Sequence, residues 1–373
     1  MFVAGIDAHA TFSVIAIVSN TGELVHKPVR VRNADADRLD ELLEPFRPLE
    51  VVVETSPAWP WLFDRLAGPG VRFVLAHAKR LRIIAESNYK SDDIDAEVLA
   101  RMRLAGLIPE VHTKSVEQRE QAVLLRNRAR LVRQRTQMAN RIHSQLHNVG
   151  LHLERGRLLT QDGREWIRTH AWPRFGEQRR LFITMQWQLI DHLEPMIKTL
   201  DRKVLRMGRN NPAVAQLQTI PGIGAYRALV IATEALPITR FRTPAHLVSY
   251  AGLAPRSSQS GLRPIRHGSI PSGANRWLRG TFVRAVVSHV THAPDSWLTA
   301  SYDQVKQRLG WQVARIATAR RLARAVHAML RSGDVWNDQP LASHNGRPCP
   351  RYTGPRQGEA PRAACRSTTA HSD

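Results

Sequence analysis

The chain has 373 residues and a formal net charge of +22, from 54 Lys plus Arg against 32 Asp plus Glu. That length predicts two or three domains, and a hydrophobic fraction of 43% excludes disorder throughout. No run of about 18 apolar residues occurs, so we expect no membrane span, no signal peptide and no membrane partner. The only cysteines, Cys349 and Cys365, exclude a disulfide scaffold and a cysteine zinc site, and favour a reducing cytosol.

The excess positive charge is concentrated in one part of the chain. Residues 1–109 carry a net charge of −2, residues 110–336 carry +22, and residues 337–373 carry +2. Arginine supplies most of the basic charge, and its planar guanidinium binds phosphate through two hydrogen bonds. We therefore expect a near-neutral domain joined to a basic body that binds nucleic acid.

The N-terminal residues predict an α/β domain. Three strands are expected in a row, and then helices alternate with short β-branched runs typical of buried strands. The predicted strands are 2–7, 12–18, 24–31, 50–54 and 71–75, and the predicted helices are 35–46, 58–67 and 77–87. This order of elements is that of the ribonuclease H-like fold.

Two long helical patterns follow, at about 114–149 and 175–207. The first contains neither Pro nor Gly, and its apolar residues recur at helical spacing among many arginines. Two such helices in sequence predict an antiparallel coiled-coil arm. The arm either binds nucleic acid or is a helical spacer with a solvated face, and its candidate contacts are Arg126, Arg130 and Arg133.

The remaining residues predict a mainly α-helical C-terminal domain and a polar tail. Helices are expected near 225–235, 243–250, 275–292 and 304–331. The tail is rich in Pro and Gly and lacks periodicity, so we expect it to be disordered. The predicted domains are a catalytic α/β domain at 1–109, a basic helical arm at 110–210, the C-terminal domain at 211–336 and the tail at 337–373.

Four carboxylates of the α/β domain are candidate metal ligands. Asp7 and Glu54 end two predicted strands, and adjacent parallel strands would bring them together at one edge of the sheet. Asp92 and Asp95 lie on one face of the helix that KSDDIDAEVLA opens. Such a group suits two divalent cations about 4 Å apart, which promote phosphoryl transfer. Taken singly, each carboxylate could instead be a turn residue or a helix cap.

The C-terminal domain contains two patterns suited to phosphate. LQTIPGIGAYRALVIATEA predicts a helix-hairpin-helix element, in which Gly222 and Gly224 let backbone amides approach a phosphate; a simple tight turn is the alternative. A loop at 254–274 is dense in Ser, Gly and Arg. A serine there could attack a phosphodiester, or the loop could only bind phosphate. The candidate contacts around this loop are Arg256, Arg263, Arg266, Arg276 and Arg279.

Eight short motifs together resemble one family, the transposases of insertion-sequence family 110, including its 1111 subgroup. They run in family order over about 330 residues and are GIDAH, VVVETS, KSDDIDA, NRIHSQLHNVGL, TIPGIG, YAGLAPR, QSG and GANRWLR. The sequence departs from the family pattern at Ala10, where Lys is common, and at Leu262, where the family commonly has a second Gly after Ser-Gly. Ser257 and Ser258 lie close to Ser260, so the residues alone leave the nucleophile open.

The resemblance implies a DNA transposase or recombinase with a RuvC-like DEDD domain. In such an enzyme Asp7, Glu54, Asp92 and Asp95 hold Mg²⁺, as two ions in the RuvC-like site, and Ser260 forms a covalent link to DNA. The implied partners are donor and target DNA, a structured noncoding guide RNA encoded by the element, and further copies of the chain in a dimer or tetramer. The implied location is the bacterial cytoplasm, at the nucleoid when bound to DNA. The alternative function is a structure-specific nuclease, like a junction resolvase, that cuts with metal-activated water.

Overall fold

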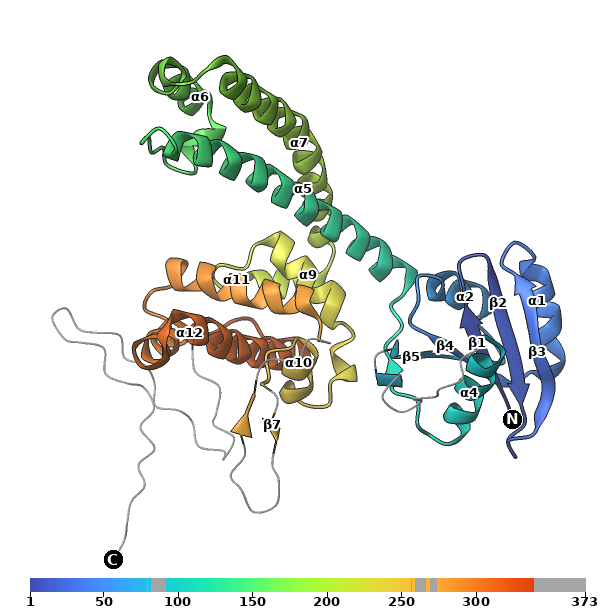
Figure 1. The fold of residues 1–373 in the computed structure, drawn as a ribbon. Coiled ribbons are helices and arrows are strands. Elements are labelled where there is room, and N and C mark those ends of the chain that lie inside the picture. Colours follow the sequence, from blue (N-terminus) through green and yellow to red (C-terminus); the bar gives the residue numbers. More distant parts are fainter. Residues whose placement is uncertain (79, 82–91, 256, 259–265, 269–273, 339–373) are drawn as a thin grey trace, which may run out of the picture. The chain divides into compact units, whose positions relative to one another are not determined.

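The computed structural model describes residues 1–78, 80–81, 92–255, 257–258, 266–268 and 274–338, and Figure 1 shows its fold. The chain divides into two compact units, the first spanning Met1–Arg119 and the second beginning at Glu120. The first unit is a sheet with helices, and the second is largely helical.

The first unit contains a mixed sheet. Its strands, as far as the chain is described, have the order β3-β2-β1-β4-β5-β6, in which β4 is parallel to β1 and β5, and the other neighbours are antiparallel. The strands are β1 (Phe2–Ala8), β2 (Phe12–Val18), β3 (Leu24–Arg32), β4 (Leu49–Glu54), β5 (Val71–Ala76) and β6 (Glu110–Val111). This arrangement confirms the ribonuclease H-like sheet that the sequence predicts.

Helices cover both faces of this sheet, which explains the unbroken apolar run of β4. On one face, Ile6 and Val53 belong to a core with residues of α1 (Ala36–Leu43) and α2 (Trp59–Leu66). On the other face, Val52 packs with Leu99 of α4 (Asp92–Leu104). Successive side chains of a strand point to opposite faces, so β4 must be apolar at nearly every position.

One predicted helix of this unit differs from the observed one, and another is largely untested. α1 ends at Leu43 and gives way to the 3-10 helix η1 (Glu44–Phe46), because Pro45 has no N–H to continue the helical hydrogen bonds. Most of the helix predicted at 77–87 lies outside the described residues.

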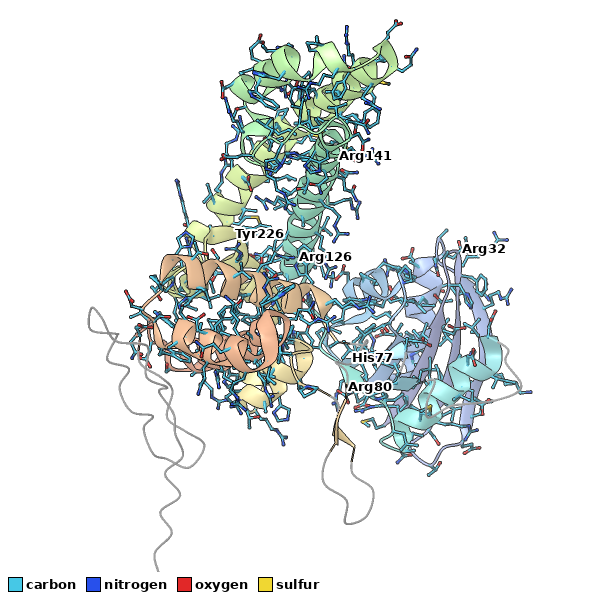
Figure 2. The ribbon with its side chains drawn as sticks, turned by 60° about the vertical axis from the view of Figure 1, so that its left-hand side comes forward. Arg32, His77, Arg80, Arg126, Arg141 and Tyr226 are labelled. Atoms are coloured by element: carbon cyan, nitrogen blue, oxygen red, sulfur yellow. The ribbon has the colours of Figure 1, made fainter. Side chains whose placement is uncertain are left out.

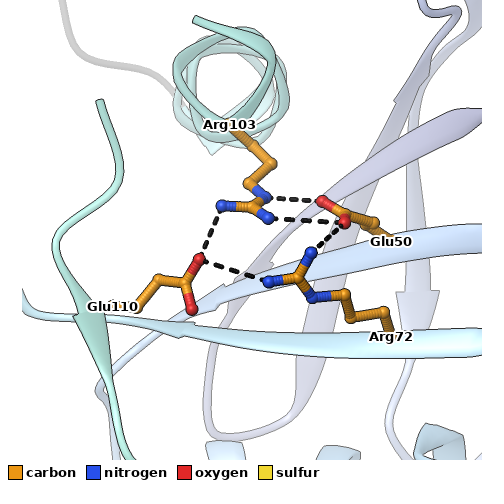
Figure 3. A network of polar contacts seen from close by, with 4 residues as sticks. All are labelled: Glu50, Arg72, Arg103 and Glu110. Carbon is orange, nitrogen blue, oxygen red and sulfur yellow. Dashed lines mark hydrogen bonds and ion pairs between the residues drawn. The ribbon is translucent and has the colours of Figure 1, made fainter. Parts of the chain in front are cut away.

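A network of two arginines and two glutamates joins the end of α4 to the sheet (Figure 3). Buried Glu50 of β4 accepts hydrogen bonds from Arg103 Nε at 2.5 Å and from Arg72 Nη1 at 2.9 Å. Glu110 accepts from Arg103 Nη1 at 2.6 Å. The hydrogen bond from Arg103 is the main reason that the pKa of Glu50 lies below its usual range. The network therefore fixes the C-terminal end of α4 against β4 and β5.

The second unit consists of helices and a two-stranded ribbon. Its boundary with the first unit falls within the long helix α5. The α-helices are α5 (Val116–His147), α6 (Gln161–His170), α7 (Glu177–Arg209), α8 (Pro212–Gln218), α9 (Ala225–Ala235), α10 (Pro244–Tyr250), α11 (Arg276–His292) and α12 (Trp297–Ser332). The remaining elements are the 3-10 helices η2 (Arg157–Leu159), η3 (Trp172–Arg174) and η4 (Ile238–Arg240), and the strands β7 (Ser257–Ser258) and β8 (Arg266–His267).

The long helices α5 and α7 run antiparallel. Arg128 of α5 pairs with Asp201 of α7 at 2.8 Å, and Arg135, seven residues further on, pairs with Glu194, seven residues earlier, at 2.8 Å. One helix therefore advances as the other returns, which confirms the two long helices that the sequence predicts. At their far end, Ile142 and Trp187 join a small apolar core with Ile167 of α6.

A larger apolar core holds the rest of the second unit together. It contains residues of α8, α9, α10, α11 and α12, together with Leu125 of α5 and Val204 of α7. The last helix begins at Trp297, earlier than the predicted 304, and Gly310 interrupts its helical backbone with a φ of 80°. No helix in the described ranges is long and apolar enough to cross a membrane.

Candidate active site

The first two candidate carboxylates lie at neighbouring strand ends. β1 and β4 are parallel, and Ile6 lies opposite Val53 in their register. Asp7 and Glu54 are the next residues on the two strands, so their side chains share one face of the sheet. Both are partly buried, and Glu54 is the last residue of β4.

The start of α4 lies on this same face because the helix packs very closely against β1. A Cβ atom at Gly5 would lie 2.0 Å from the carbonyl oxygen of Ala96 and 2.8 Å from the amide nitrogen of Ala100. Only glycine allows backbone to approach backbone this closely. Asp92 and Asp95, in the first turn of α4, are thereby brought to the end of β1.

Asp7 and Asp92 meet around a histidine. His9 Nε2 lies 3.0 Å from Asp7 Oδ2 and 3.4 Å from Asp92 Oδ1. One ligand atom from each of these three residues lies within 4.8 Å of the other two. Arg30 of β3 also approaches Asp92, with Nη2 3.3 Å from Asp92 Oδ2.

Phe12 packs against His9 and Arg30, the two side chains that contact Asp92. The His9 ring stacks on the Phe12 ring with centroids 4.5 Å apart, and the guanidinium carbon of Arg30 lies 4.1 Å from the centre of the same ring. Stacking of this kind restricts the side chains that approach a site. The strand β2, which begins at Phe12, therefore supports the cluster from beside β1.

Burial raises the pKa of Asp7 above its usual range. The charge and the hydrogen bond of His9 lower this pKa, and the nearby carboxylates of Asp95 and Asp92 raise it. Asp95 is exposed but close enough to Asp7 for this electrostatic effect. Carboxylates that repel one another in a partly buried place are stabilised by a bound cation.

The chemistry of these residues suits a divalent metal ion. Mg²⁺ binds in proteins through one or two carboxylates and keeps several waters, which matches Asp7 and Asp92 at a partly exposed edge. A histidine nitrogen suits Mn²⁺ or Zn²⁺ better than Mg²⁺. His9 is thus either a metal ligand or a partner that orients Asp7 and Asp92.

Sequence reasoning missed three residues near this edge because it considered only carboxylates. His9 and Arg30 contact the candidate ligands directly, and His9 stands two residues after Asp7 in GIDAH, which could have indicated it. His77 follows β5, the neighbour of β4, and its buried Nδ1 has no hydrogen-bond partner among the described residues. Figure 2 shows His77 with Arg80.

The proposed nucleophile, Ser260, lies outside the described residues, as do Arg256 and Arg263. Nearby, β7 and β8 pair antiparallel with Ser258 opposite Arg266. The side chains of the ribbon residues, Arg266 among them, are not described. The structure therefore describes the base of the serine loop and not the serine itself.

The two ends of the serine loop are joined where the loop leaves the helical core. The backbone N–H of Asn275 donates to the carbonyl oxygen of Tyr250 at 3.0 Å, and Asn275 Nδ2 donates to the Tyr250 hydroxyl at 3.2 Å. A Cβ atom at Gly252 would lie 2.6 Å from the Cβ of Ala274, so glycine is required for the two ends to meet. We call these four residues the loop neck.

Buried Glu234 of α9 holds the neck. Its Oε2 accepts a hydrogen bond from Asn275 Nδ2 at 2.8 Å, and its Oε1 lies 3.2 Å from Arg126 Nη2. Arg126, a predicted nucleic-acid contact, is therefore also an ion-pair partner of a buried carboxylate. Such a pair is costly to break because the remaining charge stays buried.

The Pro-Gly-Ile-Gly turn has two different glycines. A Cβ atom at Gly222, whose φ is 81°, would lie 2.6 Å from the amide nitrogen of His289, so this glycine allows α11 to pack against the turn. Gly224 has open space where its Cβ would be and precedes the first residue of α9. The side of Gly224 on which a Cβ would lie is therefore open, and the corresponding side of Gly222 is filled by α11.

The other predicted phosphate contacts are on the surface. Arg130 and Arg133 of α5 and Arg276 of α11 are exposed, and Arg279 is partly buried. Within the described ranges, none of the four forms an ion pair. Unpaired arginines of this kind are available to bind phosphate.

A ribonuclease H-like sheet with clustered carboxylates at its parallel strand ends defines an enzyme that acts on nucleic acid with a divalent metal. Residues 4–150 match the DEDD family of IS110, described as "Transposase", and residues 214–303 match the family described as "Transposase IS116/IS110/IS902 family". The chain belongs to the IS110 family of transposases, and it is a DEDD transposase, an enzyme of DNA transposition.

Curated relatives from several bacteria are similar to the chain, two of them over about two thirds of it or more. The "Probable family 20 transposase" of Pseudomonas aeruginosa is 30% identical over 249 residues, which cover 65% of this chain and 72% of the relative. The "Transposase for insertion sequence element IS1111A" of Coxiella burnetii is 26% identical over 287 residues, covering 75% and 77%. The "Pilin gene-inverting protein" of Moraxella bovis is 29% identical over 147 residues, covering 38% and 45%.

Proposed function

We propose that the chain cuts and rejoins DNA strands with a two-part chemistry. Asp7, Glu54, Asp92 and Asp95 hold Mg²⁺, as two ions, and Ser260 is a nucleophile that forms a covalent link to DNA. The observation that carries the proposal is the convergence of Asp7 and Asp92 around His9, within the DEDD region.

Bound Mg²⁺ would neutralise charge on the phosphate and lower the pKa of an attacking oxygen. The chain's own residues prepare that site. The β1 and β4 ends and the first turn of α4 hold the carboxylates, and Gly5 sets the distance between strand and helix. Arg30 orients Asp92 by a charge-assisted contact.

The serine step conserves the number of phosphodiester bonds. The Ser260 oxygen attacks phosphorus, a serine–phosphate bond forms, and the bond from phosphorus to one sugar oxygen breaks. That oxygen leaves as a free hydroxyl and takes up the proton that the serine loses. A hydroxyl of the other duplex then attacks the serine–phosphate bond and restores the serine, so rejoining needs no external energy source.

The remaining parts of the chain bind and align the nucleic acids. We propose a catalytic domain at 1–109, a coiled-coil arm at 110–210 and a serine-bearing domain with a helix-hairpin-helix element at 211–336. The partners are donor and target DNA, an element-encoded guide RNA and further copies of the chain, in the bacterial cytoplasm. The proposed phosphate contacts are Gly222, Gly224, Arg126, Arg130, Arg133, Arg256, Arg263, Arg266, Arg276 and Arg279.

A trapping experiment tests this proposal against the nuclease alternative. The full chain is incubated with DNA, Mg²⁺ and RNA transcribed from the region flanking its gene, and detergent-stable protein–DNA adducts are mapped to a residue. We expect an adduct at Ser260 that Ser260→Ala abolishes. Cleavage that Ser260→Ala leaves unchanged, with no adduct from the unmodified chain, would instead identify a nuclease that uses metal-activated water.

A further inference from the structure

Three arginines of the second unit lie close enough to interact electrostatically with Tyr226 or with one another, and one of them stacks on the Tyr226 ring. Arg128 comes from α5, Arg227 from α9 and Arg284 from α11, so three helices converge here. Figure 2 shows Tyr226 near Arg126, where the long helices meet the shorter ones. The Tyr226 hydroxyl donates to the carbonyl oxygen of Leu125 at 3.2 Å, which fixes α9 to α5.

Two of these arginines are held in place, and one is exposed. The guanidinium carbon of Arg128 lies 4.4 Å from the centre of the Tyr226 ring, and its Nε donates to Asp201 at 2.8 Å. Arg227 Nη1 donates to the carbonyl oxygen of Gly222 at 2.6 Å. Arg284 is exposed. The group is therefore pre-formed on one side and open to solvent on the other.

The group has more positive charge than its surroundings neutralise. Asp201 is the carboxylate that pairs with Arg128, and no carboxylate in the described part of the chain pairs with Arg227 or Arg284. Burial lowers the pKa of Arg227, and the charges of Arg284 and Arg128 lower it further. An anion bound here would relieve the repulsion among the three guanidinium groups.

The form of the group suits one oxyanion in particular. Guanidinium groups bind phosphate through paired hydrogen bonds, and a phosphodiester carries a single negative charge on two free oxygens. The nearby turn adds Gly224, whose open side leaves room for a backbone chain to pass. None of these contacts would distinguish one base from another.

We propose that Arg227 and Arg284, supported by Arg128 on Tyr226, form a binding site for a backbone phosphodiester of nucleic acid. The site rests on the DNA-binding role of the transposase family. It depends neither on Ser260 nor on the metal.

The first test measures the salt dependence of binding by the full chain. Binding of a 30-base-pair DNA duplex, and of an RNA duplex of the same sequence, is followed by fluorescence anisotropy at several salt concentrations. Loss of one phosphate contact lowers the slope of log affinity against log salt by about 0.9. We expect this reduction for Arg284→Gln on two unrelated sequences, and we expect Arg284→Lys to retain most of the slope.

The matched control is Arg331→Gln, which removes one exposed charge from α12. It should leave the slope unchanged, and thermal unfolding should show that each variant folds like the unmodified chain. A reduction on DNA alone or on RNA alone identifies which nucleic acid occupies the site. An unchanged slope on both, or an equal reduction in Arg331→Gln, overturns the proposal.

A second test locates the contact. Single phosphates of the better-binding duplex are replaced by neutral methylphosphonates. At one position this replacement should weaken binding to the unmodified chain and have no further effect on Arg284→Gln. Equal sensitivity of both proteins at every position contradicts the site. Cleavage and adduct formation are scored separately, so this site can fail while the proposed strand-joining chemistry stands.

Discussion

Two groups of carboxylates, one in each unit, have opposite roles. In the first unit, Asp7 and Asp92 are brought together at a partly buried strand end, where their negative charges repel each other and a bound cation would be stabilising. In the second unit, Glu234, Asp201 and Glu194 each hold an arginine of α5 in place. The first unit therefore owes its candidate metal site to closely placed carboxylates. The second unit owes its candidate phosphate contacts to an excess of arginines held in fixed positions.

Loss of one clustered carboxylate should have the largest effect. Asp7→Asn should lower the rate of DNA cleavage in Mg²⁺ by about 10³-fold, because a metal contributes several kcal/mol of charge stabilisation. Binding of DNA by the second unit should change little. Glu41→Gln, an exposed acid of the same unit, is the control. An Asp7→Asn protein that retains cleavage would remove the carboxylate cluster from the mechanism.

The close contact of α4 and β1 should be the next most sensitive feature. Gly5→Ala should destabilise the first unit by about 3 kcal/mol, because its Cβ would overlap backbone atoms of α4. It should also raise the Mg²⁺ concentration needed for half-maximal cleavage, because Asp92 moves with the helix and the carboxylates then bind the ion less tightly. Denaturant unfolding and Mg²⁺ titration measure the two effects. Gly68→Ala, where nothing lies within 4 Å of the new atom, should change neither.

The buried anchor of the second unit gives the corresponding test there. Glu234→Ala should lower the free energy of unfolding by about 2 kcal/mol, because Asn275 Nδ2 loses the closer of its two acceptors and Arg126 loses its carboxylate partner. Tryptophan fluorescence in denaturant follows this loss. The exposed Glu120→Ala should be neutral. Equal stability of the two variants would show that Glu234 does not anchor the loop neck.

Acid should weaken the first unit through Glu50. The folded-state pKa of this group is lowered, so its contribution is present above its unfolded-state pKa and is lost as pH falls through the folded-state value. Arg103→Gln removes the main cause. The difference in unfolding free energy between the unmodified chain and this variant should be about 1 kcal/mol larger at pH 7 than at pH 3. A difference independent of pH contradicts this assignment.

The smallest effect concerns single surface charges. Arg130→Gln and Arg133→Gln should each lower the salt slope of DNA binding by about 0.9, which amounts to roughly 3-fold in affinity between 50 and 200 mM salt. Arg38→Gln in the first unit removes the same charge from an exposed position and should leave the slope unchanged. An equal reduction of the slope in all three variants would mean that phosphate binding is not confined to the second unit.

The sequence predicts most of the first unit because its signals are local. The β-branched run of β4 and the uninterrupted pattern of α5 indicate a buried strand and a long helix directly. The helix α6 is missed because Gly163 looks like a break. A Cβ there would lie 1.9 Å from the carbonyl oxygen of Arg157, so this glycine serves packing within the structure.

In the candidate site, too, local patterns predict some residues and contacts between distant segments are missed. The sequence motifs identify Asp7, Glu54, Asp92 and Asp95 as candidates. The alternation of side chains along a strand explains why Asp7 and Glu54 share one face of the sheet. The positions of His9 and Arg30 depend on Phe12, a residue of another strand, and the arginines around Tyr226 come from three helices. Contacts between distant segments leave no pattern in a single sequence.

The loop neck has a consequence for how such enzymes diversify. Because Tyr250 and Asn275 are hydrogen-bonded to each other, the core ends on one side of this join and the serine-bearing segment begins on the other. Segments closed in this way tolerate changes of length, since the entropy of closing a loop rises slowly with its length. The segment between the two residues could therefore be exchanged among relatives as a cassette, giving one helical core a new substrate preference.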